Sequence, residues 1–263
     1  MVYGVLTIDI DTCVSGAGRW ALRLLSQGPI GLMHLVMFDI DGTLTRSCGI
    51  DSRCFVDALC EVLGIESIDT DWSNYRHTTD SGIAQEIITK QLGRPACDGE
   101  LAAVKRSFVQ RLRLALDNDP AECQANAGVQ EILEWINNQP RLCFAVATGG
   151  WSESAQLKLA NAGLKVAENI FASSDDAVSR EAIMRIAEAR ARSAYGVDRF
   201  DSITYVGDAV WDLVAAQACN YSFIGVGVGD AAGQLGHAGV DSLIPSFAVG
   251  DGFRELIEQK LLF

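Results

Sequence analysis

The sequence predicts an α/β protein whose core is a parallel sheet between two layers of helices, with an all-helical cap inserted into it. Two observations lead to this fold class. From Leu142 onward, short apolar runs alternate with amphipathic segments, as in parallel sheets that helices cover on both faces. From about residue 51 to residue 117 the pattern is helical only. A helical block after the first strand indicates a separate cap over one edge of the sheet.

The predicted strands are short and apolar on both faces. The first is the run His34–Phe38, and the later strands alternate with helices that have one apolar face. Ligands of such sheets bind at the carboxyl ends of the strands, so the residues after each strand are candidates for a site. We expect strands at 142–147, 169–172, 202–206 and 221–226, and helices at 127–138, 152–162, 179–192 and 210–219.

The cap is predicted as three helices, at residues 52–63, 80–92 and 99–116. Segments that contain glycine and proline separate them, and these residues end helices. Residues 1–32 have no place in the strand–helix alternation, and we expect a peripheral or poorly ordered N-terminal extension there. We therefore divide the rest of the chain into a core, residues 33–48 and 121–263, and a cap, residues 49–120.

Composition excludes several classes of function. The chain of 263 residues has a net charge of −13, which argues against nucleic acid and anionic membranes as partners, because both attract a basic surface. No apolar stretch approaches the length of a membrane span. The eight cysteines are scattered and form no Cys-x-x-Cys pair, which argues against a zinc site and fits a reduced cytoplasmic setting.

The segment Asp39-Ile-Asp41-Gly-Thr43 directly follows the first predicted strand. Residues i and i+2 of a strand point the same way, so two carboxylates are forced together. Their repulsion favours a bound cation or a shared proton. This geometry suits a Mg²⁺ site in which one carboxylate is a nucleophile and the other a proton carrier. The alternative is an acidic surface turn or a helix cap.

Three further signals follow later strands in order. Thr148-Gly149-Gly150 opens a helix with a hydroxyl and backbone N–H groups, which suits phosphate. Arg180 starts the next helix and supplies a cation. Asp208 and Asp212 then form an acidic pair across one helical turn, which can hold a divalent cation or its waters. Each has an ordinary alternative as a helix start, a solvated arginine or a capping aspartate, but their ordered combination is specific.

These motifs, DIDGT at 39–43, Thr148, Arg180 and GDAVWD at 207–212, resemble those of the haloacid dehalogenase-like hydrolase superfamily, whose catalytic core is Rossmann-like. The resemblance covers roughly residues 33–260. It implies that Asp39 is the nucleophile and forms an aspartyl-phosphate, and that Asp41 protonates the leaving alcohol and then activates water. An aspartate at position 41 favours phosphate esters within this superfamily, because dehalogenases lack it.

The resemblance also implies the ligands of phosphate and metal. We expect Thr43, Thr148, Gly149 and Arg180 to bind phosphate, and Asp39, Asp41 through its carbonyl, Asp208 and Asp212 to hold Mg²⁺ or its waters. The family usually has lysine where this chain has Arg180, but arginine keeps the charge and can bind two oxygens. Lys158 and Lys165 are alternatives for this cation, and we prefer Arg180.

The position of the cap resembles that of phosphoglycolate phosphatase-like members, in which the cap contacts the leaving group of the substrate. Arg46, Arg76 and His77 are candidates for such contacts, although a solvated loop is an equal interpretation of residues 75–82. The leading hypothesis is a Mg²⁺-dependent phosphomonoester hydrolase that acts on a small phosphorylated metabolite. One alternative is a phosphomutase of the β-phosphoglucomutase type. The other is a nucleotide-binding module, suggested by the glycines between residues 225 and 229. The sequence does not indicate the oligomeric state.

Overall fold

The computed structural model describes residues 32–260, and a parallel sheet with the strand order β5-β4-β1-β6-β7-β8 forms its centre. The first strand of the chain, β1, lies inside the sheet and pairs in parallel with both β4 and β6. The predicted parallel sheet is therefore confirmed. Its strands are β1 (His34–Phe38), β4 (Leu142–Ala147), β5 (Phe171–Ala172), β6 (Ser202–Gly207), β7 (Ser222–Val226) and β8 (Leu243–Ile244).

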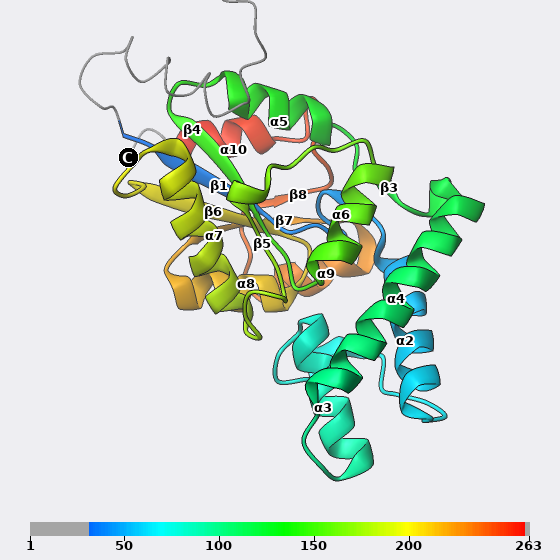
Figure 1. Cartoon of the computed structure of the whole chain (residues 1–263). Coiled ribbons are helices and arrows are strands. Elements are labelled where there is room, and N and C mark those ends of the chain that lie inside the picture. Colours follow the sequence, from blue (N-terminus) through cyan, green and yellow to red (C-terminus); the bar gives the residue numbers. More distant parts are fainter. Residues whose placement is uncertain (1–31, 261–263) are drawn as a thin grey trace, which may run out of the picture.

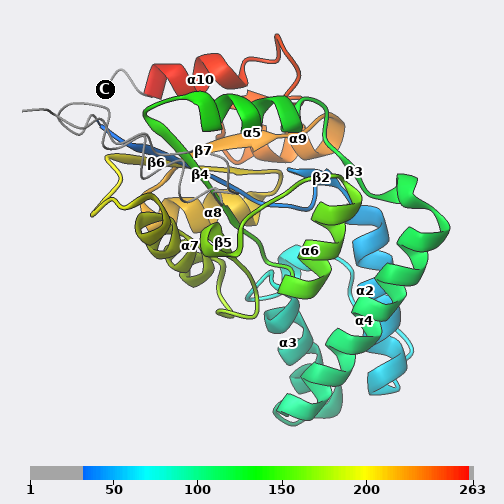
Figure 2. The same ribbon diagram turned by 45° about the horizontal axis from the view of Figure 1, so that its top comes forward.

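Helices cover both faces of this sheet, as the alternation predicts. Figure 2 shows α5 and α10 on one face and α7 and α8 on the other. The helices of the core are α5 (Val129–Asn138), α6 (Ser152–Asn161), α7 (Arg180–Tyr195), α8 (Val210–Cys219), α9 (Gly229–His237) and α10 (Phe253–Lys260). None of the helices that the structure describes combines the length and the apolar character of a membrane span.

Local sequence explains where these elements begin and how they pack. The hydroxyl of Ser179 accepts a hydrogen bond from the N–H of Ala182 and so caps the start of α7, which satisfies an otherwise free helix donor. All five residues of β1 are buried. Phe38 on this strand packs against Phe247 and Phe253, with ring centroids 6.0 and 6.1 Å away. Burial of one such ring contributes roughly 1.5–3 kcal/mol.

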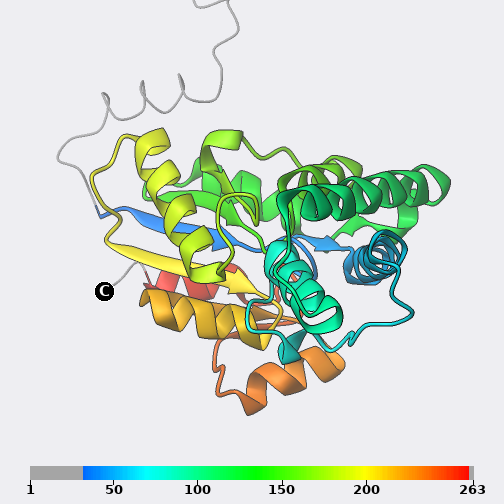
Figure 3. The same ribbon diagram turned by 60° about the horizontal axis from the view of Figure 1, so that its bottom comes forward.

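The cap consists of α2 (Cys48–Leu63), α3 (Asp80–Leu92) and α4 (Asp98–Asn118). These helices lie together at one end of the sheet (Figures 1 and 3). The short antiparallel pair of β2 (Thr45–Arg46) and β3 (Gln124–Ala125) joins the two crossings between core and cap. Phe55 and Phe108 form the centre of a separate apolar cluster in the cap, to which the core contributes Trp151.

Element boundaries differ from the predictions at a few places. Helix α2 begins at Cys48, four residues before the predicted start, and its first turn includes Ile50, which is almost fully buried. The sequence does not predict this turn, because the glycine at position 49 has a low helix propensity. Packing of Ile50 stabilises the turn in the folded protein. The predicted N-terminal extension, residues 1–32, lies outside the described residues except for Leu32.

His34 on β1 gives a test of the core. Its ring is buried, Nδ1 is hydrogen-bonded to the Ser202 hydroxyl, and Nε2 finds no partner among residues 32–260. Burial, with a smaller effect of the Lys260 charge, lowers the pKa of His34 from 6.5 to about 4.

Between these two pH values the unfolded chain binds a proton that the folded chain does not, so acid favours unfolding there. As the pH falls from 6.5 to about 4, we expect His34 to lower the free energy of unfolding by about 1.4 kcal/mol for each pH unit. Urea titrations at several pH values should therefore give a shallower pH dependence for His34→Gln than for the unmodified protein. Parallel curves would contradict this assignment.

Candidate active site

The carboxyl ends of three neighbouring strands meet at one edge of the sheet. Phe38 at the end of β1 is in register with Val146 of β4 and Val206 of β6, so Asp39, Thr148 and Asp208 follow at the same edge. A cavity of about 120 Å³ lies there, between core and cap. Its lining residues are Asp39, Asp41, Cys48, Asp51, Ser52, Phe55, Trp72, Thr78, Thr79, Asp80, Ile83, Thr148, Gly149, Gly150, Arg180, Asp208 and Trp211.

Three of the predicted metal ligands come together in this structure. Asp39, Asp208 and Asp212 each offer a carboxylate oxygen, and these oxygens lie within 4.8 Å of one another. Asp39 is 3% exposed, and its Oδ1 has no hydrogen-bond donor within residues 32–260. A buried, unsatisfied carboxylate oxygen beside two other carboxylates is the donor set that a hard divalent cation prefers, so the residues fit Mg²⁺. The carboxylate of Asp41 lies outside this group of three.

Crowding and burial disfavour the ionised forms of these carboxylates. Burial, followed by the charge of Asp212, raises the pKa of Asp39 to about 8, and burial also raises the pKa values of Asp208 and Asp212. Arg180 opposes this effect, because its Nη1 lies 2.7 Å from Asp212 Oδ1 and 3.7 Å from Asp39 Oδ1. One guanidinium thus faces three carboxylates, and the site carries an excess of negative charge that a cation would offset.

Gly42 allows the loop that follows β1 to approach Asp208 closely. Its φ angle is +78°, and a Cβ atom at this position would lie 1.9 Å from Asp208 Oδ2. Any other residue would be strained in this conformation and would displace the Asp208 carboxylate. The glycine of the first motif is therefore required both for its backbone angle and for the close contact with the fourth motif.

The phosphate-binding candidates lie as follows. Thr148 is buried, and its Oγ1 accepts a hydrogen bond of 3.1 Å from the N–H of Gly150. Arg180 lies against Gly149, since a Cβ there would be 2.7 Å from Nη2, and its Nε donates to the carbonyl of Thr78 on the cap at 2.9 Å. Thr43 is fully buried outside the cavity lining, and its hydroxyl has no partner in the described part of the chain.

Lys158, which the sequence offers as an alternative to Arg180, occupies a different place. Its side chain on α6 is completely buried, and its Nζ lies 2.5 Å from both Asp41 Oδ2 and Asp51 Oδ1. Burial would lower the pKa of Lys158, but the charges of Asp41 and Asp51 outweigh burial and raise it. The site therefore contains two cations, Arg180 beside Asp39 and the buried Lys158 at Asp41.

The sequence did not predict that Lys158 pairs with Asp41 and Asp51. Lys158 lies three residues after Ala155 and one before Leu159, and both of these apolar residues are on the buried face of α6. A lysine at that spacing indicates a buried cation that needs acidic partners. The partners, Asp41 and Asp51, are more than 100 residues away in the chain, so spacing alone could not identify them.

Asp41 is held on both oxygens. The hydroxyl of Ser47 donates to Oδ1 at 2.5 Å, and Lys158 donates to Oδ2 at the same distance. Charge-assisted hydrogen bonds of this kind fix orientation as well as charge. The same lysine reaches Asp51 on the first turn of α2, so the orientation of Asp41 is linked to the position of the cap.

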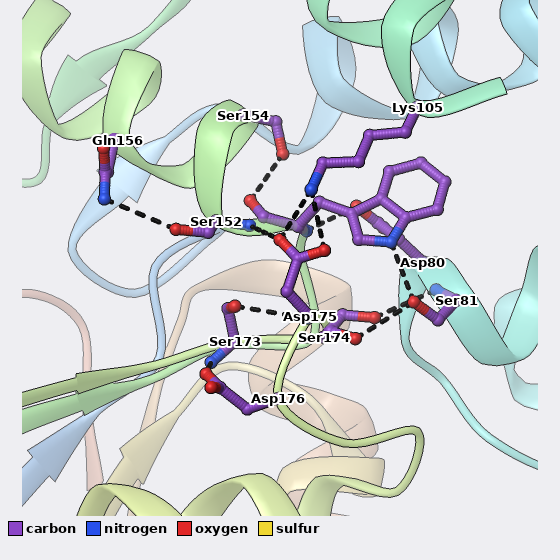
Figure 4. Close-up of polar contacts among 11 residues, drawn as sticks. Asp80, Ser81, Lys105, Ser152, Ser154, Gln156, Ser173, Ser174, Asp175 and Asp176 are labelled. Atoms are coloured by element: carbon purple, nitrogen blue, oxygen red, sulfur yellow. Dashed lines mark hydrogen bonds and ion pairs between the residues drawn. The ribbon is translucent and has the colours of Figure 1, made fainter. Parts of the chain in front are cut away.

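The start of α3 binds directly to the loop after β4. Asp80 Oδ2 accepts a hydrogen bond of 2.8 Å from the N–H of Trp151, and the N–H of Asp80 donates to the carbonyl of Gly149 at 2.8 Å. In Figure 4 the adjacent Ser81 points toward Ser174, and Lys105 of α4 points toward Asp175. The cap therefore contacts the core directly, through α3 at the loop after β4 and through α4 at Asp175.

The three candidates for substrate contacts lie outside the residues that line this cavity. Arg46 is exposed on β2. Arg76 and His77 line a neighbouring hollow that shares Thr78, Arg180 and Trp211 with the cavity.

The buried lysine pair provides a test of the site. Lys158→Met leaves two half-buried carboxylates without their cation, and we expect a loss of about 3 kcal/mol in the free energy of unfolding. In a double-mutant cycle with Asp51→Asn, measured by urea unfolding, the coupling energy should be about 1–3 kcal/mol. The exposed pair Arg53–Glu122, at 2.6 Å, is the control and should couple by less than about 1 kcal/mol. Equal coupling energies would contradict the account.

Known proteins share this architecture. A haloacid dehalogenase-like hydrolase model matches residues 33–220, while the comparison with curated proteins gives no match. A hydrolase from Pseudomonas syringae is 21% identical, with a TM-score of 0.65, over 85% of this chain and 97% of that one. A putative β-phosphoglucomutase from Bacteroides vulgatus is 16% identical, with a TM-score of 0.64, over 93% and 97%.

A predicted phosphoglycolate phosphatase from Haemophilus somnus is 18% identical, with a TM-score of 0.56, over 87% of this chain and 100% of that one. At such identities the solved structures establish the fold alone. The family model, however, covers more than half of the chain and includes the strand-end motifs described above. The protein therefore belongs to the haloacid dehalogenase-like hydrolase family.

Proposed function

We propose that the protein is a Mg²⁺-dependent phosphomonoester hydrolase that works through a phosphorylated Asp39. The observation that carries this proposal is the buried Oδ1 of Asp39, which lacks a hydrogen bond within the described residues and lies beside Arg180, Asp208 and Asp212. Asp39, Asp208 and Asp212 would hold the metal or its waters. When bound, Mg²⁺ neutralises negative charge on the carboxylates and on the phosphoryl group.

In the first step the Asp39 carboxylate attacks phosphorus, and the bond between phosphorus and the leaving oxygen breaks. Asp41 gives its proton to that oxygen, which departs as an alcohol. In the second step Asp41 takes a proton from water, which attacks the aspartyl-phosphate and releases inorganic phosphate. Ser47 and Lys158 keep the Asp41 carboxylate in one orientation for both transfers.

Phosphate oxygens would be held opposite the nucleophile. The Thr148 hydroxyl, the N–H of Gly149 and the guanidinium of Arg180 all belong to residues that line the cavity beside Asp39. These donors stabilise the charge that spreads over the phosphoryl oxygens in the transition state. Because Arg180 also donates to the carbonyl of Thr78, contact between cap and core positions this cation.

Hydrolysis and phosphoryl transfer to a second sugar phosphate use the same first step. A putative β-phosphoglucomutase and a predicted phosphoglycolate phosphatase both share the fold, so the fold does not distinguish the two reactions. We favour hydrolysis, and the cavity of about 120 Å³ suits a small phosphorylated substrate in either reaction. A phosphorylated enzyme that reacted with sugar phosphate faster than with water would support the mutase instead.

The proposal is tested by phosphate release from a panel of small phosphate esters with Mg²⁺. Asp39→Asn removes the nucleophile, and we expect a loss of at least about a thousandfold in kcat/KM. EDTA should abolish phosphate release, and added Mg²⁺ should restore it. The exposed residue Asp230 on α9 gives the matched control, since Asp230→Asn should leave activity unchanged. Full activity of Asp39→Asn, or no effect of EDTA, would disprove the mechanism.

A further inference from the structure

The wall of the cavity that the cap provides is acidic and aromatic. We infer that the leaving group of the substrate carries no second acidic group and presents hydrogen-bond donors, as hydroxyl or ammonium groups. This inference rests on the proposed function, because it concerns the alcohol that leaves after Asp39 attacks. It assigns Asp51 and Asp80, which have no role in the two chemical steps, as the residues that select the substrate.

Charge is the first reason. Among the described residues, the carboxylates of Asp39, Asp41, Asp51, Asp80 and Asp208 line the cavity together with a single lysine or arginine side chain, that of Arg180. This guanidinium already pairs with Asp212 and donates to the cap, and the phosphate of the substrate requires it as well. A second phosphate or a carboxylate on the leaving group would therefore meet like charges without a cation of its own.

Lys158 does not change this balance. It lies outside the cavity lining, has no exposed side-chain surface, and is bonded to Asp41 and Asp51 at 2.5 Å each. To reach a substrate anion it would have to leave both of these carboxylates, which is unfavourable. Lys158 thus holds carboxylates rather than substrate.

Hydrogen-bond capacity is the second reason. Asp51 uses Oδ1 for Lys158, and Asp80 uses Oδ2 for the N–H of Trp151. Both residues line the cavity, and the second oxygen of each is an acceptor for a donor from the ligand. Ser52 adds a hydroxyl to the same wall. Carboxylate acceptors bind hydroxyl and ammonium groups and repel carboxylates.

Aromatic rings complete this wall. Phe55 and Trp72 of the cap and Trp211 on α8 of the core line the cavity, and the rings of Phe55 and Trp72 pack at 6.0 Å. Such faces cover the carbon atoms of a small alcohol, and they attract an ammonium group through the negative faces of the rings. Acidic and aromatic side chains therefore favour the same class of leaving group.

Two pairs of esters of matched size test the inference. The first pair is 2-aminoethyl phosphate and 2-phosphoglycolate, and the second is glycerol 3-phosphate and 3-phosphoglycerate. We expect kcat/KM with Mg²⁺ to be at least about tenfold higher for the non-acidic member of each pair. Equal or higher values for the acids would overturn the inference. If the acids were preferred and Arg76→Ala removed that preference, the neighbouring hollow at Arg76 would be the selecting site instead.

Variants of the two carboxylates separate selection from a general loss of function. Asp51→Asn and Asp80→Asn keep the size of the side chain but remove its charge, so the ratio of kcat/KM within each pair should fall toward one. A merely structural effect would lower both members equally and leave the ratio unchanged, which would overturn the assignment of these residues. Asp57→Asn, on the exposed side of the same helix α2, is the control and should keep the ratio.

The outcome also distinguishes this inference from the proposed function. If p-nitrophenyl phosphate and all four esters released no phosphate with Mg²⁺, the proposed hydrolase activity would be wrong, and the inference would be wrong with it. If Asp39-dependent hydrolysis occurred but the acidic esters were the better substrates, the hydrolase activity would stand and the selection by Asp51 and Asp80 alone would be disproved.

Discussion

The concentration of carboxylates at one buried edge of the sheet is the constraint on which the rest of the site depends. Asp39, Asp208 and Asp212 share a space in which three negative charges are unfavourable. Arg180 offsets part of this charge, and the buried Lys158 offsets the charge of the neighbouring Asp41. A divalent cation would neutralise the negative charge that remains, which is the physical basis of the proposed dependence on Mg²⁺.

Much of this arrangement was predictable because parallel strands bring distant residues to a common edge. Asp39, Thr148 and Asp208 each follow a strand, so their proximity follows from order and register. The role of Lys158 was not predictable, because it depends on how α6 and α2 pack after the cap has been inserted. The absence of Arg46 and Arg76 from the cavity lining was not predictable either, because it depends on how the cap and the short β2–β3 pair pack against the core.

Under the proposed function, the cap contributes to chemistry as well as to selection of the substrate. Through Asp51 it reaches the lysine that orients Asp41, and through Thr78 it reaches Arg180. Asp80 joins the loop after β4 by two hydrogen bonds, one accepted by its carboxylate and one donated by its backbone N–H. In the proposed mechanism, the cap therefore holds both the proton carrier, Asp41, and the phosphate-binding cation, Arg180, so binding of the leaving group and alignment of the reacting groups would depend on the same contacts.

The central claim is that Asp39 becomes covalently phosphorylated. The most direct measurement is to quench the enzyme in acid during turnover of a phosphate ester with Mg²⁺ and to map the modified peptide by mass spectrometry. The account predicts one phosphoryl group, located on Asp39, that disappears when substrate is exhausted. A phosphoryl group on any other residue, or turnover with an unmodified Asp39 under conditions that trap acyl phosphates, would contradict it.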